Sequence, residues 1–360
     1  MNFYIHVPFC RSKCGYCAFY SETACTDDVI EAYLDKLCRQ LSQHRGEVAE
    51  TLYIGGGTPT LLSAKQLKRL TDMVAESLVF ADGAEKSIEC NPETLDGEKL
   101  ELLSGFFTRI SVGVQSFDPA LRQTIGRRCS QEKLLDVLDM VAQSGFKHWN
   151  CDLIYALPGQ SAEAWQEELC QVAEYGVDHV SCYALTAEEE AALGFELVED
   201  DDRAEAFYHM AAEVLAKYGI RRYEISNYAV PGGECQHNLR VWRGEKLIGF
   251  GPSAAGFDGM ARNIETPSLG GWLAGDAAEK DVITSEARLN EIFAVNLRTV
   301  AGWHRTMWEN LPGADAWEKR LVAARLAAEC MPGCFEIDDD SIKLSDRGRL
   351  FWNDAAAELL

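Results

Sequence analysis

The chain has 360 residues, and its 47% hydrophobic and 25% charged residues are typical of a globular protein with a sizeable core. The formal net charge of −23 argues against nucleic acid as a partner, because phosphate binding depends on lysine and arginine. No apolar run is long enough for a membrane-spanning helix, and the first residues lack the basic and apolar regions of a signal peptide, so we expect a cytoplasmic protein.

Short β-rich segments alternate with helical patterns from the N-terminus to about residue 226. Strands are expected at 3–7, 51–54, 86–90, 109–114, 148–154, 179–183 and 220–225. Helices are expected between them at 29–41, 64–78, 95–106, 132–144, 163–175 and 204–218, with N-caps at Ser63, Asp96, Ser130 and Ser161. Such a series of βα units predicts parallel strands joined by right-handed crossovers.

The predicted strands end in polar or glycine-rich residues. Gly55-Gly56-Gly57-Thr58-Pro59 follows the second strand, and the next four end near Glu89, Gln115, Asp152 and Tyr183. A barrel enzyme builds its site from the carboxyl ends of many strands, whereas an open sheet uses one switch point. We therefore predict an α/β fold in which residues 1–226 form a partial (β/α)6 TIM-like barrel.

The rhythm of the sequence changes after residue 226. Residues 227–290 are expected to form a loop-rich connection without a clear helix. Residues 291–360 read as a small domain with helices near 291–300, 317–328 and 346–360 and a hairpin at 335–337 and 342–344. Helices followed by a hairpin suggest a winged-helix-like module, and the acidic turn of this hairpin argues against DNA binding.

Three of the thirteen cysteines, Cys10, Cys14 and Cys17, directly follow the first predicted strand. Thiolates at this spacing can close around one metal centre, and the expected reducing compartment leaves them free to do so. Zinc is the main alternative, although structural zinc takes four ligands and no second pair lies near. A thioredoxin-type pair at Cys14 and Cys17 lacks the expected helical setting. A [4Fe–4S] cluster with these three ligands would leave one iron open to a small molecule.

The triad, with Tyr16 before its last cysteine, resembles the radical S-adenosylmethionine (SAM) superfamily. The segments 4–10, 55–60, 111–117 and 152–159 are similar to its oxygen-independent coproporphyrinogen oxidase (HemN-like) branch. The resemblance implies that the open iron of the cluster binds the amino and carboxylate groups of SAM. It also implies a radical SAM barrel followed by a smaller C-terminal domain of the HemN type.

The resemblance assigns site residues one by one. It makes Cys10, Cys14 and Cys17 the cluster ligands. It assigns SAM binding to Tyr4, Tyr16, Gly56, Gly57, Thr58, Glu89, Gln115, Arg127 and Asp152. Two plainer interpretations stay open, because the glycines also suit a tight strand-to-helix turn and the polar residues also suit a buried network.

Within this branch, coproporphyrinogen dehydrogenases and haem chaperones (HemW) are the two relevant kinds of protein. Phe19 stands where the dehydrogenases usually have a fourth cysteine, and the first cluster cysteine is already residue 10. The segment His237-Asn238 followed by Val241-Trp242 resembles the chaperone signature, which normally has Tyr where this chain has Val241. Cys129 is a second departure, because a histidine is usual there.

The resemblance therefore implies a protein that binds the cluster, SAM and haem, and passes haem to an acceptor protein. His237 is the expected haem ligand and Cys235 the alternative, while a lone histidine in a loop is otherwise a hydrogen-bonding residue. An electron donor is an expected partner. SAM-dependent oxidative decarboxylation of coproporphyrinogen III is the alternative function.

Overall fold

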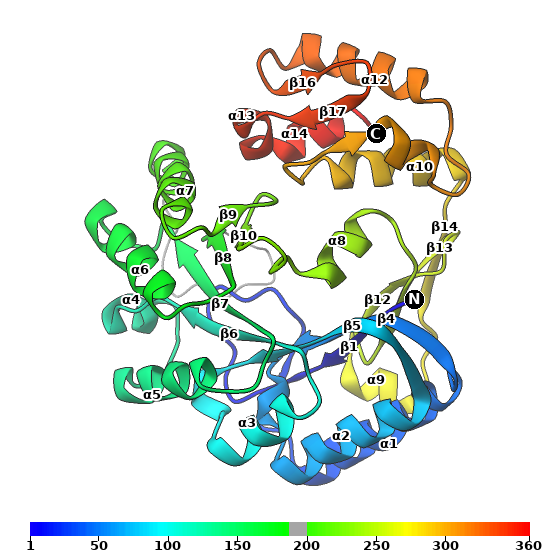
Figure 1. Ribbon diagram of the computed structural model, residues 1–360. Helices are drawn as coiled ribbons and strands as arrows, with labels where there is room; N and C mark the ends of the chain where they lie inside the picture. The colour runs from blue at the N-terminus through cyan, green and yellow to red at the C-terminus, as the bar shows by residue number, and fades with distance from the viewer. Residues whose placement is uncertain (187–199) are drawn as a thin grey trace.

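The computed structural model describes residues 1–186 and 200–360. Its centre is a curved sheet in which six parallel strands follow one another in chain order. These strands are β1 (Asn2–Val7), β4 (Glu47–Gly56), β5 (Leu78–Cys90), β6 (Arg109–Gln115), β7 (His148–Tyr155) and β8 (His179–Ala184). The predicted partial barrel is therefore confirmed (Figure 1).

Helices cover the outer face of the barrel (Figure 1). They are α1 (Asp27–Ser42), α2 (Ala64–Ser77), α3 (Gly97–Ser104), α4 (Pro119–Thr124), α5 (Gln131–Ala142), α6 (Ala162–Glu174) and α7 (Asp201–Ala216), with short 3-10 turns at Pro59–Leu61 and Pro92–Thr94. All four predicted N-caps are confirmed, since each side chain accepts a backbone N–H of its first turn. Helix α4 was not predicted. Among the described residues, no helix is long and apolar enough to cross a membrane.

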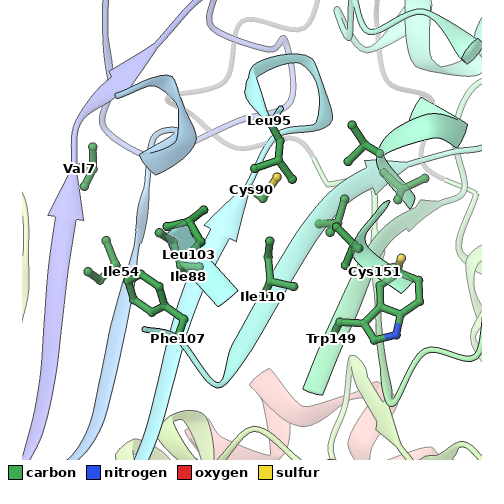
Figure 2. Packing of buried hydrophobic residues seen from close by; sticks show 14 of the residues in the cluster. Val7, Ile54, Ile88, Cys90, Leu95, Leu103, Phe107, Ile110, Trp149 and Cys151 are labelled. Atoms are coloured by element: carbon green, nitrogen blue, oxygen red, sulfur yellow. The ribbon is translucent and has the colours of Figure 1, made fainter. Parts of the chain in front are cut away.

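Side chains alternate between the two faces of each strand, so one face packs against the helices and the other points into the barrel. Ile54, Ile88, Ile110 and Cys151 are buried in the hydrophobic layer with residues of the helices (Figure 2). Neighbouring positions such as Glu89 and Asp152 point the other way, into the barrel. The apolar layer stabilises the barrel, and the polar interior is left for hydrogen bonds and ligands.

Further strands extend the sheet at both edges. At one edge β10 (Asn227–Ala229) and β9 (Arg221–Arg222) follow β8, and at the other β11 (Leu247–Phe250) pairs in parallel with β1. The sheet then continues through β12 (Ala255–Phe257), β13 (Ala261–Ile264) and β14 (Glu279–Val282). The prediction of a single strand at 220–225 is wrong, because the chain reverses there and forms the short antiparallel strands β9 and β10.

The interval 227–290 also differs from expectation. It contains α8 (Gln236–Trp242) and α9 (Leu269–Ala274) besides the edge strands. Helix α8 lies between the barrel and the C-terminal module in Figure 1. Cys235 and His237, at its beginning, are buried and bonded to Glu85, so tertiary contacts rather than an apolar stripe hold this helix in place.

The C-terminal module has its own hydrophobic cluster. Its order is α10 (Ser285–Asn296), β15 (Trp303–His304), α11 (Arg305–Glu309), α12 (Trp317–Cys330), β16 (Phe335–Ile337), β17 (Ser341–Leu344), α13 (Asp346–Leu350) and α14 (Trp352–Ala357). The hairpin β16–β17 pairs with β15, which completes a winged-helix-like topology. The single helix expected at 346–360 is wrong, because the backbone of Phe351 interrupts it between α13 and α14.

Candidate functional site

A cavity of about 610 Å³ opens at the carboxyl ends of the parallel strands. All three triad cysteines line it, and so do most of the residues assigned to SAM from the sequence: Tyr16, Gly56, Gly57, Thr58, Glu89, Gln115, Arg127 and Asp152. The volume lies within the range usual for small-molecule sites. Residues that are far apart in the chain therefore form one site.

The cysteine loop is fastened to the glycine loop after β4. Its first residues form β2 (Phe9–Cys10), which pairs with β3 (Glu22–Thr23). Gly57 N–H donates to the Val7 carbonyl at 2.9 Å, and Thr58 N–H donates to the Phe9 carbonyl at 2.7 Å. The Cys10 Sγ lies 3.5 Å from Thr58 Oγ1. The thiols are thus held at the wall of the cavity by backbone hydrogen bonds.

The arrangement of the thiols fits a multi-iron cluster. The three cysteines line one cavity, and three thiols are the donor set that a [4Fe–4S] cluster with one open iron takes. In a [4Fe–4S] cluster each thiolate binds a different iron, so the sulfur atoms surround a volume rather than a point. Burial raises the pKa of Cys17 in the free protein, and binding to iron is what would stabilise its thiolate.

Arg127 places a positive charge beside the triad. One guanidinium nitrogen lies 3.9 Å from Cys14 Sγ, and another donates to the Gly113 carbonyl. A Cβ atom at Gly113 would lie 2.9 Å from this guanidinium, so the absence of a side chain there makes room for it. A fixed cation beside the thiols offsets negative charge on a bound cluster or on a ligand carboxylate.

Glu89 faces the cavity with both carboxylate oxygens engaged. Oε1 accepts from the Tyr53 hydroxyl at 2.9 Å, and Oε2 accepts from Gly56 N–H at 3.0 Å. Burial, and then the negative charge of Asp152, raise the pKa of Glu89 to about 7. A Cβ atom at Gly55 would lie 2.6 Å from the Glu89 carboxyl carbon, which explains one glycine of the loop without any ligand.

Asp152 stands on β7 at the end of a buried polar network. Its Oδ2 accepts from Ser111 at 2.9 Å and its Oδ1 accepts from the Asn150 amide at 2.7 Å. Burial raises the pKa of Asp152, although these donors act in the opposite direction. A buried polar network, the alternative interpretation of the sequence, is therefore present around Asp152. The carboxylates of Asp152 and Glu89 nevertheless line the cavity.

Gln115 reaches the cavity from a strained backbone. Its φ is 71°, in the left-handed region, and the pairing of β6 with β7 shifts register between Gly113 and Gln115. A non-glycine residue in this conformation costs about 1–2 kcal/mol. The bulge places the Gln115 side chain in the wall of the cavity.

The two tyrosines assigned to SAM lie in different places. Tyr16 lines the cavity and packs against a small apolar cluster that includes Ile125 and Leu157. Tyr4 does not line it, because its hydroxyl bonds Nδ1 of His6 at 3.1 Å and its ring packs beside that of Tyr53. The structure therefore groups Tyr16, but not Tyr4, with the cluster cysteines.

His237 and Cys235 also lie away from the cavity wall. His237 is 5% exposed, and its Nδ1 lies 2.8 Å from Thr51 Oγ1 inside the barrel. Burial lowers the pKa of His237 to about 4, so the imidazole is neutral. Cys235 is 4% exposed beside Glu85, and burial raises the pKa of its thiol, which disfavours the thiolate form.

Sequence reasoning missed several cavity residues. Tyr53 lies on β4 two residues before the predicted glycine loop, and Ser111 lies on β6. Phe19 also lines the cavity and is 66% exposed, and Tyr183, expected only as a strand end, lines it as well. Strand alternation was the signal for Tyr53 and Ser111, because both share a face with predicted site residues at an even spacing along their strands.

Comparison with known proteins agrees with this geometry. A model described as the radical SAM superfamily matches residues 4–169. The heme chaperone HemW of Mycobacterium tuberculosis is 33% identical over 379 residues, which cover 99% of this chain and 94% of that protein. The chain belongs to the HemW family. HemW of Lactococcus lactis is likewise 33% identical, over 85% of this chain and 84% of its own.

The solved structure of coproporphyrinogen III oxidase (HemN) from Escherichia coli has the same fold as this HemW family member. Its TM-score is 0.84, and the match covers 99% of this chain and 89% of that one at 22% sequence identity. The predicted radical SAM fold with a HemN-like C-terminal part is thus confirmed.

Proposed function

We propose that this protein is a haem chaperone that holds a [4Fe–4S] cluster and SAM in its barrel cavity and delivers haem to an acceptor protein. The observation that carries the proposal is the shared cavity of Cys10, Cys14 and Cys17 with the polar strand ends. Membership of the HemW family supports the haem part. An electron donor and a cytoplasmic location belong to the same proposal.

Different residues of the cavity bind the cluster and the different groups of SAM. Cys10, Cys14 and Cys17 hold the cluster, whose open iron supplies a site for the amino and carboxylate groups of SAM. Glu89 and Asp152 accept hydrogen bonds from ligand hydroxyls, and Arg127 pairs with negative charge. Gln115 and the backbone of Gly56, Gly57 and Thr58 complete the wall that excludes water from the ligand.

Haem binding at His237 requires a rearrangement. A neutral imidazole is the form that binds iron, and the low pKa of His237 favours that form. In the structure described here its ring is buried against Tyr53 and bonded to Thr51. We propose that α8 moves away from the barrel when haem binds, so that the His237 ring becomes accessible.

An anaerobic haem titration of the cluster-loaded protein, followed by its Soret band, tests the proposal. We expect saturation at one haem per chain and weaker binding in His237→Ala. The control is His209→Ala, because His209 is a partly exposed residue of α7 that forms an ion pair with Glu205 one turn away. Unfolding midpoints of both variants show whether the fold is intact.

Two outcomes would overturn parts of this proposal. Unchanged haem binding in His237→Ala would remove the ligand assignment but leave the chaperone. Absence of specific haem binding in the cluster-loaded protein would remove the chaperone function. Decarboxylation of coproporphyrinogen III under reducing, anaerobic conditions would then support the dehydrogenase instead.

A further inference from the structure

Tyr53 lines the cavity and also packs against His237 inside the barrel. Its hydroxyl donates to Glu89 Oε1 at 2.9 Å. Its ring lies between those of Tyr4 and His237, with centroid distances of 6.3 and 5.2 Å. Rings packed on both sides restrict the rotation of the Tyr53 side chain, so the direction in which its hydroxyl points is set before any ligand arrives.

Glu89 depends on this hydroxyl because the charged groups around it are mainly unfavourable. Asp152 on β7 is the carboxylate that faces it, and the phenols of Tyr4 on β1 and Tyr183 on β8 lie near enough for Glu89 to raise their pKa values. Arg127 is engaged with Cys14 and Gly113 instead. The donors that favour ionised Glu89 are the Tyr53 hydroxyl and Gly56 N–H.

A carboxylate whose oxygens are each fixed by one donor keeps its other lone pairs in set directions. Ionised Glu89 accepts hydrogen bonds from ligand hydroxyls, whereas the protonated acid has lost part of that capacity. We propose that Tyr53 is a positioning residue for SAM binding, which holds the Glu89 carboxylate in its orientation and in its ionised form. This inference rests on the proposed assignment of Glu89 to the SAM site.

The experiment measures SAM affinity of the cluster-loaded protein by anaerobic calorimetry between pH 6 and pH 9, in wild type and Tyr53→Phe. Loss of the hydroxyl removes one of the two donors to Glu89, and we expect the pH at which affinity rises to increase by about one unit. At pH 7 the ionised fraction then falls from about one half to about one tenth, which predicts about fivefold weaker binding. At pH 9, where Glu89 is ionised in both proteins, the difference should shrink to the part that comes from the lost orientation of the carboxylate.

Tyr33→Phe is the matched control. Tyr33 is a fully buried tyrosine, whereas Tyr53 is partly exposed, and the Tyr33 hydroxyl donates to the His6 carbonyl at 2.7 Å rather than to Glu89. The substitution deletes the same atom, so a general effect of losing a buried phenol hydroxyl would appear in both variants. We expect the pH profile of Tyr33→Phe to match wild type.

Glu89→Gln separates failure of this inference from failure of the proposed site. SAM binding that is weakened by Glu89→Gln, with a pH profile that differs from that of wild type, would place Glu89 in the SAM site. An unshifted profile in Tyr53→Phe would in that case overturn the role of Tyr53 alone. SAM binding unaffected by Glu89→Gln would overturn the assignment of Glu89, and the role of Tyr53 with it.

Discussion

Strand β5 carries two glutamates on the same face, four residues apart, whose surroundings act in opposite directions. Glu85 lies at the closed end of the barrel, where it accepts from Arg109 Nε at 3.0 Å and from His237 N–H at 2.9 Å. Burial alone would raise the pKa of Glu85, but Arg109 and the backbone donors outweigh it and lower the pKa. Glu89, at the open end, faces Asp152 and has a raised pKa of about 7.

The comparison shows that the two ends of one strand have different roles, because Glu85 is paired with a cation and Glu89 lines the cavity. At the closed end each charge has a partner, and Arg109 also donates to the carbonyls of Gly233 and Glu234 that precede α8. At the open end, where the parallel strands have their carboxyl ends, Glu89 and Asp152 share a cavity, and neither forms an ion pair with a cation of the described residues. A site that holds like charges together before a ligand binds is a frequent mark of function, and it reduces stability.

Cys14→Ala, at the open end of the barrel, is expected to have the largest effect of these variants, which is loss of the cluster. Removal of one of three ligands should abolish the stable cluster, so that iron and sulfide per chain fall close to zero after anaerobic reconstitution. Cys129→Ala is the control, because Cys129 lies near Cys14 in an adjoining small pocket but is no assigned ligand. Loss of the cluster in both variants would contradict the assignment.

Arg109→Ala tests the closed end. Arg109 is 2% exposed, and its removal leaves the buried carboxylate of Glu85 without its cation. We expect the free energy of unfolding in urea to fall by about 3–5 kcal/mol. Arg11→Ala, which breaks the exposed pair with Glu93, should cost about 1 kcal/mol or less. Equal losses in the two variants would show that burial does not distinguish these ion pairs.

Glu89→Gln should stabilise the protein in the absence of SAM, in a pH-dependent manner. Because the pKa of Glu89 is raised from 4.5 to about 7 in the folded chain, wild type loses stability as the pH rises through that window. The neutral amide avoids this loss, so the variant should gain about 3 kcal/mol at pH 8 and about 1 kcal/mol or less at pH 5. Unfolding midpoints across this range provide the measurement, and an equal gain at both pH values would exclude titration of Glu89 as the cause.

The smallest expected effect concerns the backbone at Gln115. Gln115→Gly and Gln115→Ala both remove the side chain from the cavity, but only glycine adopts a φ of 71° without strain. We expect the glycine variant to be about 1 kcal/mol more stable than the alanine variant in thermal unfolding. A more stable alanine variant would show that the left-handed backbone at this position stores no strain.

Much of the barrel and of the cluster loop was predictable from the sequence because the signals are local. The spacing of Cys10, Cys14 and Cys17 lies within one loop, and the N-caps Ser63 and Ser130 act within a single helical turn. The strand ends at Glu89, Gln115 and Asp152 were also predictable, since parallel strands bring their carboxyl ends to one edge.

Other features depended on contacts between distant segments. Helix α8 has no apolar stripe from which it could be predicted. Residues 247–250 pair with residues 2–5, which are more than 200 residues away in the chain. The break at Phe351 and the turn at 223–226 likewise do not appear in the periodicity of the sequence. Local patterns carry no information about which distant partner satisfies a strand edge or a helix end.

The sequence by itself therefore determined the barrel and the cysteine triad, because short-range spacing and strand alternation encode them, while the family resemblance supplied most of the polar residues in the cavity. Only the tertiary structure decided that Glu85 is paired while Glu89 is not, that Tyr53 joins Glu89 to His237, and that His237 lies inside the barrel. These properties depend on desolvation and on neighbours from other strands, which act over short distances in space between residues far apart in the chain.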